Sequence, residues 1–140
     1  MREILFKAKR LDHGEWVEGS LITYKDGTAF ICCEDYIPDV LNKYEVEPST
    51  VCQYTGLTDK NGKKIFEGDK ITMTFSHGQR TANVVGFRDG SFGLHWKWGG
   101  VGQFTAFTGI CHVEYEVTGS IHDKEEEGRD HDTAESTKDL

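Results

Sequence analysis

The 140-residue sequence is poor in proline and has no long apolar run. It holds two prolines and four cysteines. No apolar stretch approaches the roughly 20 residues that cross a bilayer, so we expect no membrane-spanning segment. The N-terminal Met-Arg-Glu-Ile-Leu-Phe-Lys lacks the apolar core of a secretory signal. These absences predict a cytoplasmic protein whose cysteines are mostly reduced.

The spacing of cysteine, histidine and acidic residues does not fit a metal site. No Cys-x-x-Cys pair occurs, and the adjacent Cys32 and Cys33 would point to opposite faces of a strand. Asp59-Lys60-Asn61-Gly62 is similar to the start of a calcium loop, but Lys70 stands where such a loop needs a bidentate glutamate. The glycines within 99–102 lack the following Gly-Lys-Ser/Thr of a phosphate-binding loop. We therefore expect no metal and no cofactor.

Motifs for covalent catalysis are absent as well. The sequence has no Gly-x-Ser-x-Gly, and no cysteine stands at an expected helix start, where its pKa would fall. Glu67 and Asp69 flank Gly68, and we interpret these carboxylates as turn residues rather than as an acid–base pair. The sequence therefore predicts a protein that is not an enzyme.

Charge is negative overall and uneven along the chain. The formal net charge is −8. Residues 123–140 hold eight acidic and three basic residues, which gives −5, so the remaining 122 residues carry only −3. This C-terminal segment has almost no large apolar side chains, which predicts a disordered acidic tail. The body lacks the basic excess typical of nonspecific nucleic-acid binding.

Alternating apolar and polar residues between turn signals predict an all-β fold of hairpins. Asp26-Gly27, Asn61-Gly62 and Asp89-Gly90 are expected to form type I′ hairpin turns. A short helical turn near Asp39 is the one helix expected. Gly56-Leu57 is expected to begin a bend. The strands are expected over residues 3–9, 16–24, 28–33, 51–55, 71–75, 80–87, 91–98, 104–107 and 111–117.

The spacing of these expected strands and turns predicts two β modules and a tail. Residues 1–50 are expected to form an N-terminal β-meander module, and residues 51–122 a small SH3-like β-barrel module. Residues 123–140 form the expected tail. The SH3-like comparison is by analogy with the spacing of the strands.

The segment that joins the modules carries a resemblance. Its residues read Gln53-Tyr54-Thr55-Gly56-Leu57, then Asp59-Lys60-Asn61-Gly62-Lys63, then Ile65-Phe66-Glu67-Gly68-Asp69. This pattern, with Arg2-Glu3-Ile4 before it and the runs at 89–94 and 115–121 after it, resembles the YopX family of bacteriophage and prophage proteins. The resemblance covers about residues 1–122. It implies a small all-β phage protein in the cytoplasm of a bacterial host. It implies no activity and no functional residues.

Aromatic and basic residues near residue 96 are the candidate binding residues. Trp96 and Trp98 share one face of the expected strand, and Lys97 points the other way. Arg80 and Arg88 lie nearby in sequence. Small β-barrels bind single-stranded nucleic acid with such residues. The competing interpretation is that these aromatic residues fill the core of a small domain.

Protein contacts are the expected mode of action. We expect self-association, because open strand edges favour pairing, and a host protein as a further partner. Binding of single-stranded nucleic acid by Trp96, Trp98 and their basic neighbours is the alternative.

Overall fold

The computed structural model describes residues 2–33, 43–109 and 113–123. All regular elements within these ranges are β-strands or short 3₁₀ turns, so the all-β prediction is confirmed. None of the helical turns found there has the length or apolar character to cross a membrane. The helical turn expected near Asp39 and the tail expected from 124 onward lie outside the described residues. Contacts divide the chain into two compact units, Met1–Leu57 and Thr58–Leu140.

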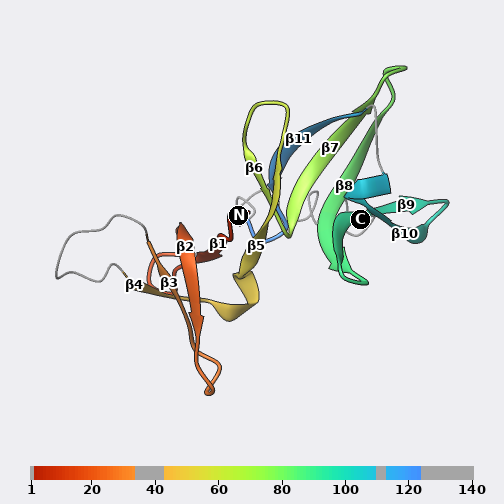
Figure 1. The fold of residues 1–140 in the computed structure, drawn as a ribbon. Coiled ribbons are helices and arrows are strands. Elements are labelled where there is room, and N and C mark those ends of the chain that lie inside the picture. Colours follow the sequence, from red (N-terminus) through yellow and green to blue (C-terminus); the bar gives the residue numbers. More distant parts are fainter. Residues whose placement is uncertain (1, 34–42, 110–112, 124–140) are drawn as a thin grey trace, which may run out of the picture. The chain divides into compact units, whose positions relative to one another are not determined.

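The first unit contains an antiparallel sheet in the order β4-β3-β2-β1-β5 (Figure 1). Its small core consists of Ala8, Ala29, Ile31 and Val46. A 3₁₀ turn, η1 (Pro48–Thr50), precedes β5, and the Thr50 hydroxyl accepts a hydrogen bond from the Lys9 backbone N–H at 2.9 Å. The strands are β1 (Phe6–Lys9), β2 (Trp16–Thr23), β3 (Ala29–Cys32), β4 (Lys43–Val46) and β5 (Cys52–Thr58).

The second unit contains a five-stranded antiparallel sheet in the order β10-β9-β8-β7-β11 (Figure 1). A short strand, β6, follows β5 through a hairpin turn, and a 3₁₀ turn, η2 (Phe107–Gly109), follows β10. The strands are β6 (Lys64–Phe66), β7 (Asp69–Phe75), β8 (Arg80–Arg88), β9 (Ser91–Trp98), β10 (Val101–Ala106) and β11 (Val113–Ser120). The barrel closure expected for this module is not found, because β10 and β11 remain the two edges of the sheet in the described part of the chain.

Two of the three predicted type I′ turns are of another kind. At Asp89-Gly90 both residues have positive φ, 53° and 82°, as the type I′ turn requires. At Asp26-Gly27 and at Asn61-Gly62 only the glycine has positive φ. The Asp59 N–H donates to the Lys63 carbonyl, and the Gly62 N–H donates back to the Asp59 carbonyl. This pattern is typical of a longer hairpin loop that ends in a left-handed glycine, so the hairpin prediction is right and the turn type is wrong.

The core of the second unit is mainly aliphatic. Ile65, Ile71, Met73, Val85 and Leu94 are buried together. Some aromatic side chains, Phe75, Phe107 and Tyr115, pack against this cluster while partly exposed. The hypothesis that the aromatic residues fill the core is therefore wrong for the strand-borne tryptophans, which lie outside the buried cluster.

Asp59 joins the hairpin turn to strand β11. It is buried, with 7% of its surface exposed. Its Oδ1 accepts hydrogen bonds from the backbone N–H groups of Asn61 and Lys63 at 2.8 and 2.9 Å, and its Oδ2 accepts one from Val117 at 3.0 Å. Burial alone would raise the pKa of this carboxyl, but the three N–H groups stabilise the carboxylate and hold the pKa below its ordinary value of 3.8.

Gly68 and Asp69 close the turn between β6 and β7. Gly68 has a φ of 79°, a conformation that favours glycine. Its N–H donates to the Val85 carbonyl, and its carbonyl accepts from the Ile121 N–H. The fully buried Asp69 accepts a hydrogen bond from the Phe66 N–H at 2.8 Å. These contacts confirm that the Glu67-Gly68-Asp69 segment serves a turn.

Candidate binding groove

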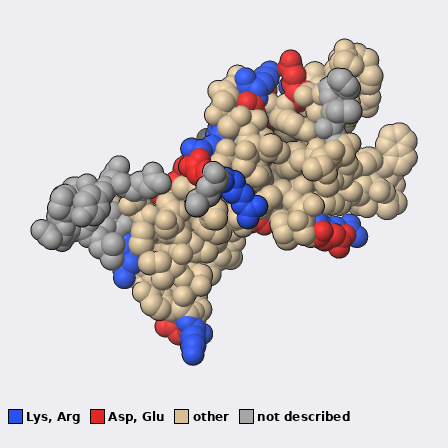
Figure 2. Space-filling model, in the orientation of Figure 1, with Lys and Arg blue, Asp and Glu red and all other residues tan. Residues whose placement is uncertain are grey.

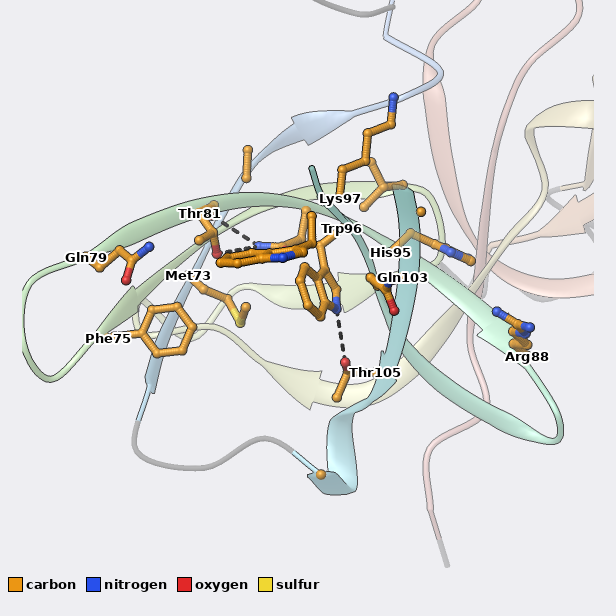
Figure 3. Close-up of a pocket in the computed structure, with 16 residues that line it drawn as sticks. Met73, Phe75, Gln79, Thr81, Arg88, His95, Trp96, Lys97, Gln103 and Thr105 are labelled. Atoms are coloured by element: carbon orange, nitrogen blue, oxygen red, sulfur yellow. Dashed lines mark hydrogen bonds between the residues drawn. The ribbon is translucent and has the colours of Figure 1, made fainter. Parts of the chain in front are cut away.

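One face of the five-stranded sheet carries a groove of about 1200 Å³. Strands β7, β8, β9 and β10 and the end of η2 supply its lining. Met73 and Phe75 line it at β7, where the sequence alternates apolar residues with threonines. Figure 3 shows these side chains together with Gln79 and Thr81 near one end and Arg88 at the other. The groove begins where the aliphatic core ends, since Met73 belongs to both.

Trp96 stands in the groove with its indole held in one orientation. Its Nε1 donates a hydrogen bond to the Thr105 hydroxyl on the neighbouring strand at 3.0 Å (Figure 3). The side chain is partly buried. A tryptophan fixed by its polar atom presents a rigid apolar surface to an occupant at low entropic cost.

Trp98 is the most exposed tryptophan of the second unit. Leu94, Trp96 and Trp98 alternate along β9, and burial falls along this row from complete at Leu94 to 73% exposure at Trp98. Val101, which pairs with Trp98 across the β9–β10 hairpin, is 61% exposed. The row therefore runs from the core to an exposed apolar tip beside the groove.

The basic candidates lie differently around the groove. Lys97 and Arg88 are among the lining residues, and Lys97 points away from Trp96, as strand alternation predicts (Figure 3). Arg88 lies 3.8 Å from the Asp89 carboxylate in an exposed pair, which holds it only weakly. Arg80 opens β8 opposite Thr74 and does not line the groove, although its neighbours in sequence do.

Asn83 places an unsatisfied acceptor at the floor of the groove. It is 2% exposed, and its amide nitrogen donates to the carbonyl and the hydroxyl of Thr81 at 3.1 and 3.2 Å. The bond to a carbonyl fixes which end of the amide is nitrogen. The opposite atom, Oδ1, is buried and has no hydrogen-bond partner among the described residues. Such an unpaired buried acceptor costs about 1–3 kcal/mol.

Two glycines, Gly86 on β8 and Gly93 on β9, leave space for groups of the neighbouring strands. A Cβ atom at Gly86 would lie 2.3 Å from the His95 Nε2, so the imidazole occupies the space that a side chain would take. The Phe104 ring lies 4.9 Å from the His95 ring. A Cβ at Gly93 would lie 2.4 Å from the Thr105 carbonyl oxygen, which is backbone. These close contacts hold β9, which carries Trp96 and Trp98, tightly between β8 and β10.

The joining segment is structural rather than part of the groove. Gln53, Tyr54, Thr55, Gly56 and Leu57 lie on β5, which continues to Thr58, and Gly56 within it has a φ of 91°. Asn61 and Gly62 form the hairpin turn, and none of these residues lines the groove. The segment that carries the resemblance thus maintains the strand connections.

Charge around the groove is slightly basic and local. Its lining, as far as the described residues form it, includes Arg88 and Lys97 and no aspartate or glutamate. On the face of the molecule drawn in Figure 2, basic and acidic side chains of the described residues are interspersed. No group of three or more His, Cys, Asp or Glu side chains in the described ranges is placed to hold a metal ion. Cys111 and His112 lie outside those ranges.

The sequence pattern identified Trp96 and Trp98 as candidate binding residues but did not identify most of the other residues that line the groove. Met73 and Phe75 lie on the strand expected at 71–75, and only the tertiary structure shows that their side of it runs on into the groove. Asn83 and Gln103 stand on the same face and interrupt an apolar alternation. A polar residue at an expected core position was the available signal for Asn83.

Comparison with known proteins gives one assignment. A search of curated proteins finds no match. The sequence profile described as YopX protein matches residues 5–126, which include both units and all the groove residues. The chain belongs to the YopX family.

Proposed function

We propose that this protein acts by binding another protein, and that the groove over β7–β10 is its binding surface. The observation that carries the proposal is Trp98, 73% exposed at the mouth of an apolar groove. Exposed tryptophan beside an apolar cavity is typical of residues that dominate binding energy at protein interfaces. Trp96, Met73 and Phe75 supply further apolar surface within the same groove.

The chemistry of the lining supports binding rather than catalysis. Among the residues that the structure describes, this lining includes no aspartate, glutamate, cysteine or serine, and His95 is the one histidine. A catalytic histidine is ordinarily paired with a nucleophile or oriented by a carboxylate, and neither stands beside His95 in the described lining. Our proposal is accordingly a non-enzymatic protein.

The proposed setting is a bacteriophage or prophage protein in the cytoplasm of a bacterial host cell. Family membership and the net charge of −8 support this setting. The sharper hypothesis is that the partner is a host protein whose activity is modulated on binding. Self-association also stays a prediction, and sedimentation of the purified chain over a range of concentrations measures it.

Single-stranded nucleic acid is the second candidate occupant. The observation that favours it is the combination of exposed Trp98 with Lys97 and Arg88 in a lining whose described residues include no carboxylate. Bases stack on exposed aromatic rings, and basic side chains pair with phosphates. The net charge of −8 disfavours it, because nonspecific nucleic-acid binding depends on positive charge.

An affinity pull-down from host lysate, run with and without nuclease, tests these two functions. We expect a protein partner that survives nuclease and is lost with Trp98→Ala. Phe87→Ala is the matched control, because Phe87 is also exposed in the second unit but does not line the groove. Capture that disappears with nuclease would replace the proposal by the nucleic-acid function. A partner retained equally by both variants would show that the groove is not the binding surface.

A further inference from the structure

The two edges of the five-stranded sheet differ in how they are protected. At the β11 edge, the Tyr115 carbonyl accepts a hydrogen bond from the Lys60 N–H at 2.9 Å, and the Val117 N–H donates to the Asp59 carboxylate. The register of β11 also shifts between Val117 and Gly119, which marks a bulge. Covered backbone groups and bulges are the devices that keep sheet edges from pairing with other strands.

The β10 edge has none of these devices. Its six residues, Val101–Ala106, include no charged residue and no proline. They pair with β9 in unbroken register. Among the residues that the structure describes, none pairs with the outer edge of this strand. The first three residues of β10 are exposed. An edge of this kind is ready to pair with an added strand.

The first unit shows that the chain protects a comparable edge. Strand β4 is an edge of its sheet and carries Lys43 and Glu45. The Glu45 carbonyl accepts a hydrogen bond from the Leu11 N–H at 3.1 Å, and Arg10 bridges to Val46. Edge charges and a crossing segment therefore cover β4. Of the sheet edges β4, β10 and β11, only β10 leaves its outer backbone groups uncovered by described residues.

The backbone groups of β10 that face outward follow from the hairpin. Gly99 and Gly100 have φ of 56° and 82° and form a two-residue turn between the paired Trp98 and Val101. Residues that flank such a turn bond to each other, and the bonding direction then alternates along the strand. Gly102, Phe104 and Ala106 accordingly turn their N–H and C=O groups away from β9.

We propose that the partner of this protein presents an extended segment that binds as an added β-strand along β10, with alternate side chains entering the groove. This inference rests on the proposed function and specifies its mode. Gly102, Gln103 and Thr105 of β10 line the groove, so a strand beside β10 lies along its rim. Main-chain hydrogen bonds supply affinity in this mode, and the pockets for alternate side chains supply specificity.

The groove also defines the chemistry of the segment. It is about six residues long, to match β10. Its groove-facing side chains are apolar or aromatic, to contact Trp96, Met73 and Phe75. It is uncharged or acidic overall, because the described part of the lining holds Arg88 and Lys97 and no carboxylate.

The probe is a phage-displayed library of random octapeptides, panned on the full-length chain. The most enriched peptide is then synthesised unmodified and with alternate amide nitrogens methylated. We expect methylation to weaken binding at least tenfold, because it removes hydrogen bonds of the added strand. We also expect slower hydrogen exchange at the Gly102 and Phe104 amides when the unmodified peptide binds.

Gly102→Pro and Gly102→Ala form a matched pair on the protein side. A Cβ at Gly102 meets no atom within 4 Å, and its φ is not positive, so either side chain has space. Proline removes the outward N–H, and alanine keeps it. We expect the proline variant to bind at least tenfold more weakly than the alanine variant, because the two differ in the outward N–H. Circular dichroism checks that each variant is folded. The methylated peptide tests the main-chain hydrogen bonds of the added strand without any change to the protein.

Four outcomes overturn the inference. Equal binding of methylated and unmodified peptides, lost with Trp98→Ala, would leave the proposed function standing and replace strand addition by side-chain docking. Association of the free chain that Gly102→Pro abolishes would make a second copy the occupant. Failure of every peptide, with fluorescence quenching by single-stranded oligonucleotide instead, would overturn both proposals. Peptide binding that neither Trp98→Ala nor Gly102→Pro affects would place the binding site elsewhere and also overturn both.

Discussion

Replacing Asp59 by alanine removes the acceptor of three backbone hydrogen bonds at once. These bonds come from Asn61, Lys63 and Val117, at 2.8–3.0 Å. A buried donor left without a partner costs about 1–3 kcal/mol. Asn61 and Lys63 are exposed residues whose N–H groups gain water, so the largest cost falls on the partly buried Val117. We therefore expect the free energy of unfolding to fall by about 2–4 kcal/mol.

The asparagine variant separates charge from shape. Asp59→Asn keeps one acceptor oxygen for the turn but turns an N–H donor toward the Val117 N–H, so we expect a loss of about 1–2 kcal/mol. Asp26→Asn is the control, because Asp26 accepts from Thr28 in a similar turn at an exposed site. We expect a loss below about 1 kcal/mol there. Urea unfolding followed by tryptophan fluorescence measures all three variants. A loss below about 0.5 kcal/mol for Asp59→Ala would refute this reasoning.

The same carboxylate predicts a pH dependence with a definite sign. The pKa of Asp59 in the folded protein is lowered from 3.8, so its contribution to stability is present above about pH 4. That contribution is lost as the pH falls through the folded pKa. The difference in unfolding free energy between the parent and Asp59→Asn should be constant near neutral pH and shrink below about pH 4. A difference that grows on acidification would contradict the assigned hydrogen bonds.

Three further changes test the sheet, the groove and the tail. Gly93→Ala should destabilise the protein by about 2 kcal/mol or more in urea unfolding, because its Cβ meets the Thr105 backbone, which has no freedom to move aside. Trp98→Ala should leave the melting temperature within about 2 °C, because the side chain is 73% exposed, whereas Trp96→Ala should lower it clearly. A chain ending at Asp123 should keep the parental melting temperature, since it retains the described contacts. A large fall would show that the acidic segment takes part in folding.

Sequence alone determined the β character and most of the strand positions. Alternation placed β9 at 91–98, as the structure has it, because a strand with one buried face must repeat every two residues. The turns at Gly68 and at Asp89-Gly90 were also predictable from sequence, because few residue types adopt the positive φ that these turns need. Local sterics dictate each of these features, so a short stretch of residues contains all the information.

Tertiary structure decided what the local pattern leaves open. The glycine turns at 26–27 and 61–62 depend on flanking hydrogen bonds, so the dipeptides did not fix their type. Alternation put Trp96 and Trp98 on one face but did not say where that face leaves the core. The order of five strands decides this, because it sets which side chains lie opposite β9 and leaves β10 at an edge. The groove and its bare edge arise from contacts between distant residues, which no local pattern of one sequence encodes.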